Sequence, residues 1–212
     1  MMHIEHLTVN VFQENTYILS APDGTAVVVD PGCLFPEETQ MLKQRIQERH
    51  LKVQAVLLTH AHLDHIFGVD AVCDAFKVPL YAHAQAPELI QRLPQLCSMY
   101  GLPPMACRLP DYFLADGDVF TFGEVELECM HVPGHSPDHL VFIHHHREAI
   151  IGGDVLFKDS IGRTDLPGGD HDALIRNIKE KLFLLPDTYQ VYPGHGPQTL
   201  LGREKQFNPF LQ

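Results

Sequence analysis

Four side chains of types that bind metal ions lie within six consecutive residues of this 212-residue chain. They are His60, His62, Asp64 and His65, in the order His-Ala-His-Leu-Asp-His. In an extended loop, residues two positions apart point the same way, so His60 and His62 can face one ion. Asp64 and His65 lie about one turn further along and can face a second ion. Because neutral imidazole is the commonest metal ligand in proteins, this segment predicts a metal site.

Three more segments present a metal-binding side chain after an apolar stretch or in a glycine-proline turn. His135 follows Val-Pro-Gly, Asp154 ends the stretch Ile-Ile-Gly-Gly, and His195 lies in the turn Pro-Gly-His-Gly. A carboxylate at the end of a buried strand is costly unless it is paired or bound to a metal. With the first segment, these residues complete two three-ligand sites that share one carboxylate.

The composition excludes several classes of function. The chain is 45% hydrophobic and 20% charged, with a formal net charge of -12 and 15 histidines. So acidic a chain is poorly suited to nucleic acid, because binding there depends on Lys and Arg that neutralise phosphates. No apolar run approaches the roughly 18 residues of a membrane span, so we expect no membrane partner.

Location and domain organisation are predicted from the same features. Five scattered cysteines without a CxxC pair predict reduced thiols, and the N-terminus has no basic or apolar region of a secretory signal. We therefore expect a cytoplasmic protein, with no obligate protein partner evident. No linker or internal repeat divides residues 1–212, which predicts one domain.

The elements that must position the metal ligands follow from the apolar periodicity. Strands are predicted over residues 3–11, 15–20, 26–30, 55–58, 78–82, 119–122, 124–131, 139–144, 149–152 and 191–192. Helices are predicted over residues 36–50, 66–76, 84–98 with an interruption at Pro94, and 172–185, the last helix of the chain. Strands precede helices in each half. This order favours an α/β (α+β) fold, in which two mostly antiparallel sheets pack face to face with helices outside each, over a single parallel sheet.

Two smaller features complete the survey of elements. Every histidine-rich metal segment follows a predicted strand, and loops at strand ends are where a rigid scaffold carries chemistry. The run His144-His145-His146 is different, because it is predicted to be a solvated turn at a hairpin tip.

The segments HAHLDH, PGHSPDH, GGDVLF and PGHGP, in this order and spacing, resemble those of the metallo-β-lactamase superfamily. Within it, the stretch GGDVLF…IGRTDLPGGD, the closing PGHGPQTLLGREKQFNPFL and the overall length resemble the short bacterial type II glyoxalases, which are hydroxyacylglutathione hydrolases. The resemblance spans nearly the whole chain, from Asp30 to Leu211. It implies an αββα sandwich, without the C-terminal helical extension of longer glyoxalases II.

The resemblance also implies two metal ions per chain and a role for each ligand. The first ion would be bound by His60, His62 and His135, the second by Asp64, His65 and His195, and Asp154 would bridge the two. Zinc is the expected metal, and iron and manganese also accept histidine and carboxylate ligands. The roles of two further residues stay open. His139 either orients a ligand or is a core histidine with its hydrogen bonds satisfied, and Asp30 either bonds a ligand histidine or caps its turn.

The implied reaction is hydrolysis of a thioester. Two ions that share a water lower its pKa to near 7. The hydroxide then attacks a carbonyl carbon, with Asp64 and Asp154 as the catalytic carboxylates and one ion stabilising the oxyanion. The implied substrate is S-D-lactoylglutathione, which gives D-lactate and glutathione.

Arg163 is the implied substrate-binding residue. A basic residue at this position would hold the glycine carboxylate of glutathione, because an arginine fork suits a carboxylate. The alternative is a surface arginine paired with Asp165. Longer glyoxalases have a tyrosine where this chain has Asp165, and they continue into a region with further basic contacts, so we expect weaker glutathione binding here.

Three other functions compete with this one. Persulfide dioxygenases carry a similar Gly-Arg-Thr-Asp segment but use one iron, bound by residues matching His60, His135 and Asp154, so the complete second site argues against them. A lactonase or another hydrolase could use the same seven ligands with a different pocket. A non-catalytic binding module is disfavoured, because its sign would be a missing ligand.

Overall fold

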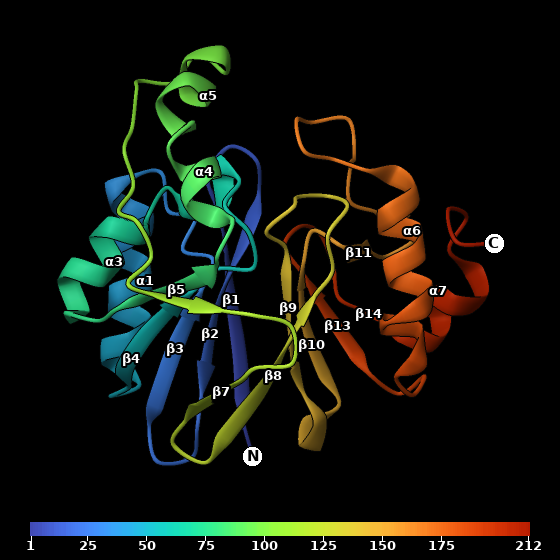
Figure 1. Ribbon diagram of the computed structural model, residues 1–212. Helices are drawn as coiled ribbons and strands as arrows, with labels where there is room; N and C mark the ends of the chain where they lie inside the picture. The colour runs from blue at the N-terminus through green and yellow to red at the C-terminus, as the bar shows by residue number, and fades with distance from the viewer.

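The computed structural model describes residues 1–212 as two six-stranded β-sheets packed face to face, with helices on the outer face of each (Figure 1). This αββα arrangement confirms the predicted fold. The first sheet has the order β1-β2-β3-β4-β5-β6, with bounds His3–Val9, Glu14–Ser20, Thr25–Val29, Lys52–Leu57, Leu80–His83 and Tyr112–Leu114. The second has the order β14-β13-β10-β9-β8-β7, with bounds Thr199–Leu200, Gln190–Pro193, Ala149–Gly153, Leu140–His144, Val125–His131 and Val119–Phe122. A separate pair consists of β11 (Leu156–Phe157) and β12 (Ser160–Ile161).

The helices divide between the two outer faces. On the side of the first sheet are α1 (Pro36–Glu48), α2 (Leu63–Ile66), α3 (Val69–Phe76), α4 (Ala86–Ile90) and α5 (Leu93–Met99). On the side of the second are α6 (His171–Glu180) and α7 (Leu201–Phe207), with 3-10 turns at His145–Arg147 and Leu182–Leu184. No helix has the length and apolar character that crossing a membrane requires.

Three hydrophobic clusters hold the four layers together. One lies between the two sheets and includes Leu57, Phe122 and Phe142. The other two lie between each sheet and its helices, around Leu42 on the first side and Ile178 on the second. All residues of β2, β3, β9 and β10 are buried, because their two faces contribute to two clusters at once.

The prediction of mostly antiparallel sheets is wrong for the first sheet. The second sheet has one parallel pair, β10 with β13, but in the first sheet β3, β4, β5 and β6 all run parallel. Parallel neighbours need a crossover, which helices usually provide. Here α1 connects β3 to β4, α3 follows β4, and α4 and α5 follow β5.

Several element boundaries also differ from the predicted ones. Asn10 has φ 53°, which ends the first strand at Val9. The helix predicted over residues 66–76 is two helices, and Gly68 between them donates its amide to Pro31 O at 2.8 Å. Pro94 does not interrupt a helix, because it lies in the first turn of α5, where a proline needs no hydrogen-bond partner. The short strands β6, β11, β12 and β14 and the helix α7 were not predicted.

The two sheets are joined directly at the edge where β2 meets the loop after β13. Asn15 donates its backbone amide to Gly194 O at 2.7 Å and its side-chain amide to Pro193 O at 3.1 Å. The buried Tyr17 hydroxyl donates to the same Pro193 carbonyl at 2.7 Å. These bonds fix the position of His195, the next residue along.

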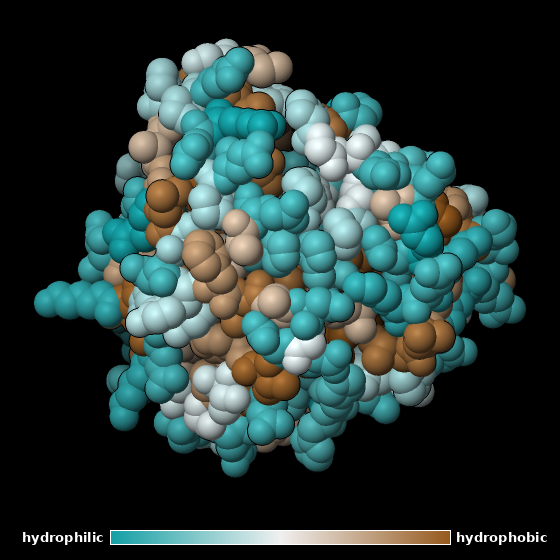
Figure 2. Space-filling view, in the orientation of Figure 1, coloured by the Kyte–Doolittle hydropathy of each residue, from teal (hydrophilic) through white to brown (hydrophobic).

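The surface is mostly polar on the face in view. Figure 2 shows hydrophilic residues over most of that face, with hydrophobic residues gathered in small groups between them. Exposed apolar side chains scattered in this way are usual for folded proteins and by themselves indicate no function.

We predict that Phe142→Ala lowers the free energy of unfolding by about 3–5 kcal/mol, because it leaves a cavity between the sheets. Phe207→Ala is the matched control, since that ring is 59% exposed, and should change stability by less than about 0.5 kcal/mol. Urea unfolding of the metal-free proteins measures both. Equal losses would contradict the placement of Phe142 in the inter-sheet core.

Candidate metal centre

The seven predicted metal ligands lie together at one edge of the sandwich. Each comes from a segment that follows a strand: four from the loop and short helix α2 after β4, and one each from the loops after β8, β10 and β13. The structure thus brings together residues separated by up to 135 positions in the chain. In two groups of three, each residue offers one ligand atom, and the three atoms lie within 4.8 Å of one another: His60, His62 and His135, and Asp64, His65 and His195.

In the first group, three ring nitrogens converge on one point. His60 Nε2 lies 3.1 Å from His62 Nδ1 and 3.2 Å from His135 Nε2. Nitrogens bound tetrahedrally to zinc at about 2.0–2.1 Å are about 3.4 Å apart, so the observed spacing is close to that of a tetrahedral site.

The hydrogen bonds made by Nδ1 of His60 and His135 determine whether the Nε2 atom of each ring carries a proton. His60 Nδ1 donates to Thr59 Oγ1 at 3.0 Å, and Thr59 Oγ1 donates in turn to Asp30 Oδ2 at 2.5 Å. His135 Nδ1 donates to Arg163 O at 2.7 Å. Burial lowers the pKa of both His60 and His135, so both rings are neutral and their Nε2 atoms carry unshared pairs. Two unshared pairs 3.2 Å apart repel each other unless a cation lies between them.

The second group surrounds Asp64, one of the predicted carboxylates. His195 Nε2 lies 3.1 Å and His65 Nε2 3.9 Å from Asp64 Oδ2. Asp154 stands between the groups: its Oδ1 is 3.5 Å from His65 Nε2, and its Oδ2 is 3.5 Å from His195 Nε2 and 3.6 Å from His135 Nε2. It therefore contacts one member of the first group and two of the second, as a bridging ligand would.

Unpartnered buried atoms provide an independent test of whether metal ions fit. His65 Nε2 and Asp154 Oδ1 are both buried without a hydrogen-bond partner, and they face each other. Such groups are rare in folded proteins, because each costs the desolvation of a polar atom. A cation bound by both atoms would satisfy them, so the residues present fit a two-metal centre.

Asp30 fixes two of the predicted ligands. Its Oδ1 accepts the Thr59 backbone amide at 2.7 Å, and its Oδ2 accepts both the Thr59 hydroxyl and His65 Nδ1, the latter at 3.0 Å. Of the two roles left open for Asp30, the structure shows the hydrogen bond to a histidine, His65, which is itself a predicted ligand. Carboxylates that orient metal-binding histidines in this way also raise their basicity.

His139 holds the backbone of Asp154. Its Nε2 accepts the Asp154 amide at 3.0 Å, and its ring stacks on His60 with 4.7 Å between centroids. It orients a predicted ligand, so it is more than a core histidine. Thr59 and Asp138, which accepts the Ala61 amide at 2.9 Å, were not singled out from the sequence, although each lies within three residues of a predicted ligand.

Glycine is required beside the bridging carboxylate. A Cβ at Gly194 would lie 2.3 Å from Asp154 Oδ1 and 2.7 Å from His65 Cε1, inside the space between the ligands. A Cβ at Gly162 would lie 1.8 Å from the Asp154 carbonyl oxygen. The backbone of two loops can therefore approach the centre only without side chains.

The charge states of the ligands suit cations. Burial alone raises the pKa of Asp154, but His65, His135 and His195 outweigh it and hold that pKa well below its usual range. Burial and the neighbouring His135 lower the pKa of His62 to about 3. Burial lowers the pKa of His65 and His195, but Asp64 and Asp154 outweigh it and raise the pKa of both rings. The centre therefore offers ionised carboxylates and neutral imidazoles at His60, His62 and His135, whereas a metal ion bound by His65 and His195 would displace a proton from each.

A cavity of about 700 Å³ opens over the centre. Its 20 lining residues include five of the predicted ligands, His62, Asp64, His135, Asp154 and His195, and ten hydrophobic residues. Arg163 lines it too, but its guanidinium makes two bonds to Asp165, at 2.7 and 2.8 Å. Both interpretations of Arg163 thus describe it in part: it is at the pocket, and it is paired with Asp165.

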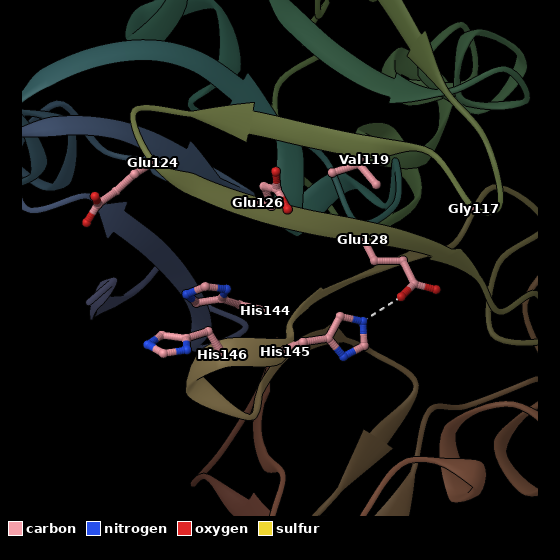
Figure 3. Close-up of a pocket in the computed structure, with 8 residues that line it drawn as sticks. All are labelled: Gly117, Val119, Glu124, Glu126, Glu128, His144, His145 and His146. Atoms are coloured by element: carbon pink, nitrogen blue, oxygen red, sulfur yellow. Dashed lines mark hydrogen bonds and ion pairs between the residues drawn. The ribbon is translucent and has the colours of Figure 1, made fainter.

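A second hollow, of about 540 Å³, lies on the surface of β8 and the β9–β10 connection, away from the seven ligands (Figure 3). It gathers Glu124, Glu126, Glu128 and the run 144–146. Both nitrogens of His145 are engaged, with Glu128 Oε2 at 2.6 Å and the Tyr189 hydroxyl at 2.8 Å. His145 and His146 lie exposed in the 3-10 turn at the hairpin tip, as predicted, whereas His144 is the last residue of β9 and is buried.

Comparison with known proteins agrees with this geometry. A family model described as the metallo-beta-lactamase superfamily matches residues 9–195. The chain is 38% identical to a protein named hydroxyacylglutathione hydrolase GloC of Haemophilus influenzae, over 99% of this chain and 98% of the relative. It is 35% identical to the probable metallo-hydrolase YqgX of Bacillus subtilis, over 99% and 98%.

Solved structures give the same result. The BLEG-1 B3 metallo-beta-lactamase superposes with a TM-score of 0.92 at 36% identity, covering 99% of this chain and 100% of that one. TTHA1623, described in a di-iron-bound form, superposes with a TM-score of 0.87 at 38% identity, covering 98% and 100%.

Asp154→Asn tests the bridging position. We expect the variant to fold but to lose at least one metal ion per chain, because a neutral amide does not bridge two cations. Elemental analysis of the purified variant measures this, with Asp172→Asn, an exposed carboxylate on α6, as the control. Two ions retained per chain with full activity would show that Asp154 is not a shared ligand.

Proposed function

The chain belongs to the metallo-beta-lactamase superfamily, and from that premise we propose that it hydrolyses thioesters of glutathione, with S-D-lactoylglutathione as substrate and D-lactate and glutathione as products. It is a metal-dependent hydrolase, as the family and its named relatives are. The observation that carries the proposal is the cluster of seven ligand-type side chains, with His60 Nε2 and His135 Nε2 only 3.2 Å apart, beneath a cavity of about 700 Å³. A cytoplasmic location and a single domain remain predictions.

Seven residues would hold two metal ions. His60, His62 and His135 would bind one, Asp64, His65 and His195 the other, and Asp154 both. Bound there, the two ions would activate a water and polarise a carbonyl group. Zinc remains the expected metal, and the di-iron form described for TTHA1623 supports iron as the alternative.

The chain's own residues keep the ligands ready before a metal binds. Thr59 and the Arg163 carbonyl hold His60 and His135 with Nε2 unprotonated, and Asp30 bonds His65 Nδ1, which turns its Nε2 toward Asp154. His195 donates Nδ1 to the Phe12 carbonyl at 3.1 Å, which turns its Nε2 toward Asp64. Such preorganisation reduces the rearrangement that metal binding and reaction require.

The pocket suits a thioester of moderate size. Its apolar lining displaces water from the region above the centre, which strengthens electrostatic interactions with the substrate carbonyl. A thiolate is a good leaving group, so the site needs no strong general acid.

A second candidate function is hydrolysis of a β-lactam amide. It is favoured by the similarity to the BLEG-1 B3 metallo-beta-lactamase over the whole chain. The same centre would act on a cyclic amide carbonyl. Comparing kcat/KM for S-D-lactoylglutathione with that for a penicillin and a cephalosporin separates the two candidates.

We predict that complete chelation abolishes thioester hydrolysis and that zinc, manganese or iron restores it, because the seven residues alone provide no nucleophile. Activity is followed by thiol release and metal content by elemental analysis, with two ions expected per chain. One iron per chain, with oxygen consumed in the presence of glutathione persulfide, would point instead to a persulfide dioxygenase. Activity that survives chelation would reveal a nucleophile outside the centre.

Arg163→Ala tests the predicted carboxylate contact. Since Arg163 already shares its guanidinium with Asp165, we expect kcat/KM for S-D-lactoylglutathione to fall by only about tenfold at low salt. Metal content should not change, because only the backbone of Arg163 contacts a predicted ligand. A lactoyl thioester without the glycine carboxylate should be hydrolysed equally by both proteins. Equal losses of kcat/KM on the two substrates would rule out a contact between Arg163 and the glycine carboxylate and would leave only the proposal of a general hydrolase.

A further inference from the structure

The cavity above the metal centre has two walls from different parts of the fold. One wall is formed by α4, α5 and the residues that join and follow them; the other is formed by β11, β12 and the segment after them, on the side of the second sheet (Figure 1). The first wall contributes Leu89, Arg92, Gln95, Leu96, Met99 and Tyr100 to the lining.

One face of α5 is turned to the cavity. Arg92, Gln95, Leu96 and Met99 stand at positions i, i+3, i+4 and i+7, which lie along one side of a helix, and all four line the cavity. Arg92 is at the N-terminal end of this face, next to α4. The wall therefore presents an apolar surface with one cation at its end.

Only two cationic side chains line the cavity, and they come from opposite walls. Arg163 belongs to the wall on the side of the second sheet, and Arg92 to the α4–α5 wall. The two guanidinium groups differ in how many of their N–H donors are already used. Arg163 uses two donors on Asp165, whereas Arg92 makes a single bond, from Nη2 to Glu88 Oε1 at 2.5 Å.

The Arg92–Glu88 pair can change partners easily. The side chains are 49% and 73% exposed, and exposed ion pairs contribute little to stability. A guanidinium has five N–H donors, so Arg92 can accept a carboxylate without releasing Glu88. Glu88 is outside the cavity lining, but its carboxylate is bonded to Arg92, so an anionic and a cationic group stand side by side at this end of the α4–α5 wall.

This arrangement matches one end of glutathione. The tripeptide carries its sulfur in the middle and a carboxylate at each end, and its γ-glutamyl end also carries a free ammonium group. A thioester carbonyl above the metal centre would leave the two ends to reach the two walls. The glycine end carries a single carboxylate, which one arginine, Arg163, can bind. The γ-glutamyl end carries a carboxylate and an ammonium group together, which suit a pair of one cationic and one anionic side chain.

We propose that Arg92 and Glu88 form the binding site for the γ-glutamyl end of the substrate, with Arg92 bound to the α-carboxylate and Glu88 to the ammonium group. The inference rests on the proposed function, since it assigns a binding site to the γ-glutamyl end of the same substrate. It makes Arg92 a specificity-determining residue for γ-glutamyl thiols.

The test uses the metal-loaded protein and a ligand that cannot be hydrolysed. Calorimetry measures binding of S-methylglutathione to the wild type, Arg92→Gln and Glu88→Gln, with Arg108→Gln as the control. Arg108 is also an arginine in ion pairs, with Asp70 and Asp74, but it lies outside the cavity lining. We expect Arg92→Gln to weaken binding by about tenfold, Glu88→Gln by a few-fold, and the control not at all. Metal content should be the same in all four proteins.

Truncated substrates assign the effect to one end of the molecule. Arg92→Gln should lower kcat/KM about tenfold for lactoyl thioesters of glutathione and of γ-glutamylcysteine. It should leave the lactoyl thioester of N-acetylcysteinylglycine, which has no γ-glutamyl group, unchanged. Glu88→Gln should lose its effect when the ammonium group of the ligand is acetylated.

Two results would overturn the inference: wild-type protein that does not bind S-methylglutathione, or an Arg92→Gln loss of the same size on all three thioesters. The proposed function fails separately. If the wild type binds S-methylglutathione through Arg92 and hydrolyses no glutathione thioester, the γ-glutamyl site stands and the hydrolysis proposal falls.

Discussion

The unshared pairs of His60 and His135 face each other across 3.2 Å in the interior of the protein, an arrangement that is stable only with a cation between them. Neither ring can turn to relieve the repulsion, because each is held by a hydrogen bond on its other nitrogen. The buried atoms His65 Nε2 and Asp154 Oδ1 have no hydrogen-bond partner, and a cation between them would stabilise them in the same way. The hydrophobic clusters on both sides of each sheet supply the stability that keeps these costly groups in place.

Asp30 connects the scaffold to the centre. It follows β3, and its carboxylate accepts from Thr59 after β4 and from His65 in α2. The two strands are parallel neighbours, so their ends meet at one edge of the first sheet. Across the interface, Asn15 and Tyr17 hold the loop of His195, which belongs to the second sheet. The centre is therefore shared by both sheets, and its geometry depends on how they pack.

The reaction type and the substrate depend on different parts of the molecule. Loops at the strand ends provide the ligands, and such loops are rigidly placed by the buried strands before them. The cavity walls come mostly from other residues, in α4, α5 and the segment around β11 and β12, although the Arg163 backbone in that segment also holds His135. Similarity over the whole chain therefore supports the metal chemistry more strongly than it supports one substrate.

The sequence alone determined most of the longer elements and the local half of the centre. His60, His62, Asp64 and His65 are close in the chain, and alternation identified most strands, because both depend on neighbouring residues. That His135, Asp154 and His195 join them was inferred from their residue types and turns, but which ion each would bind followed only from a family resemblance, since nothing local relates residues so far apart. The parallel order of β3 to β6 was missed, because alternation is the same in parallel and antiparallel strands. Only the tertiary structure showed that Asp30 and Thr59 fix the ligands and that Arg92 faces the cavity. The physical reason is that these contacts form only when the chain packs, between residues too far apart in the sequence for a local pattern to relate them.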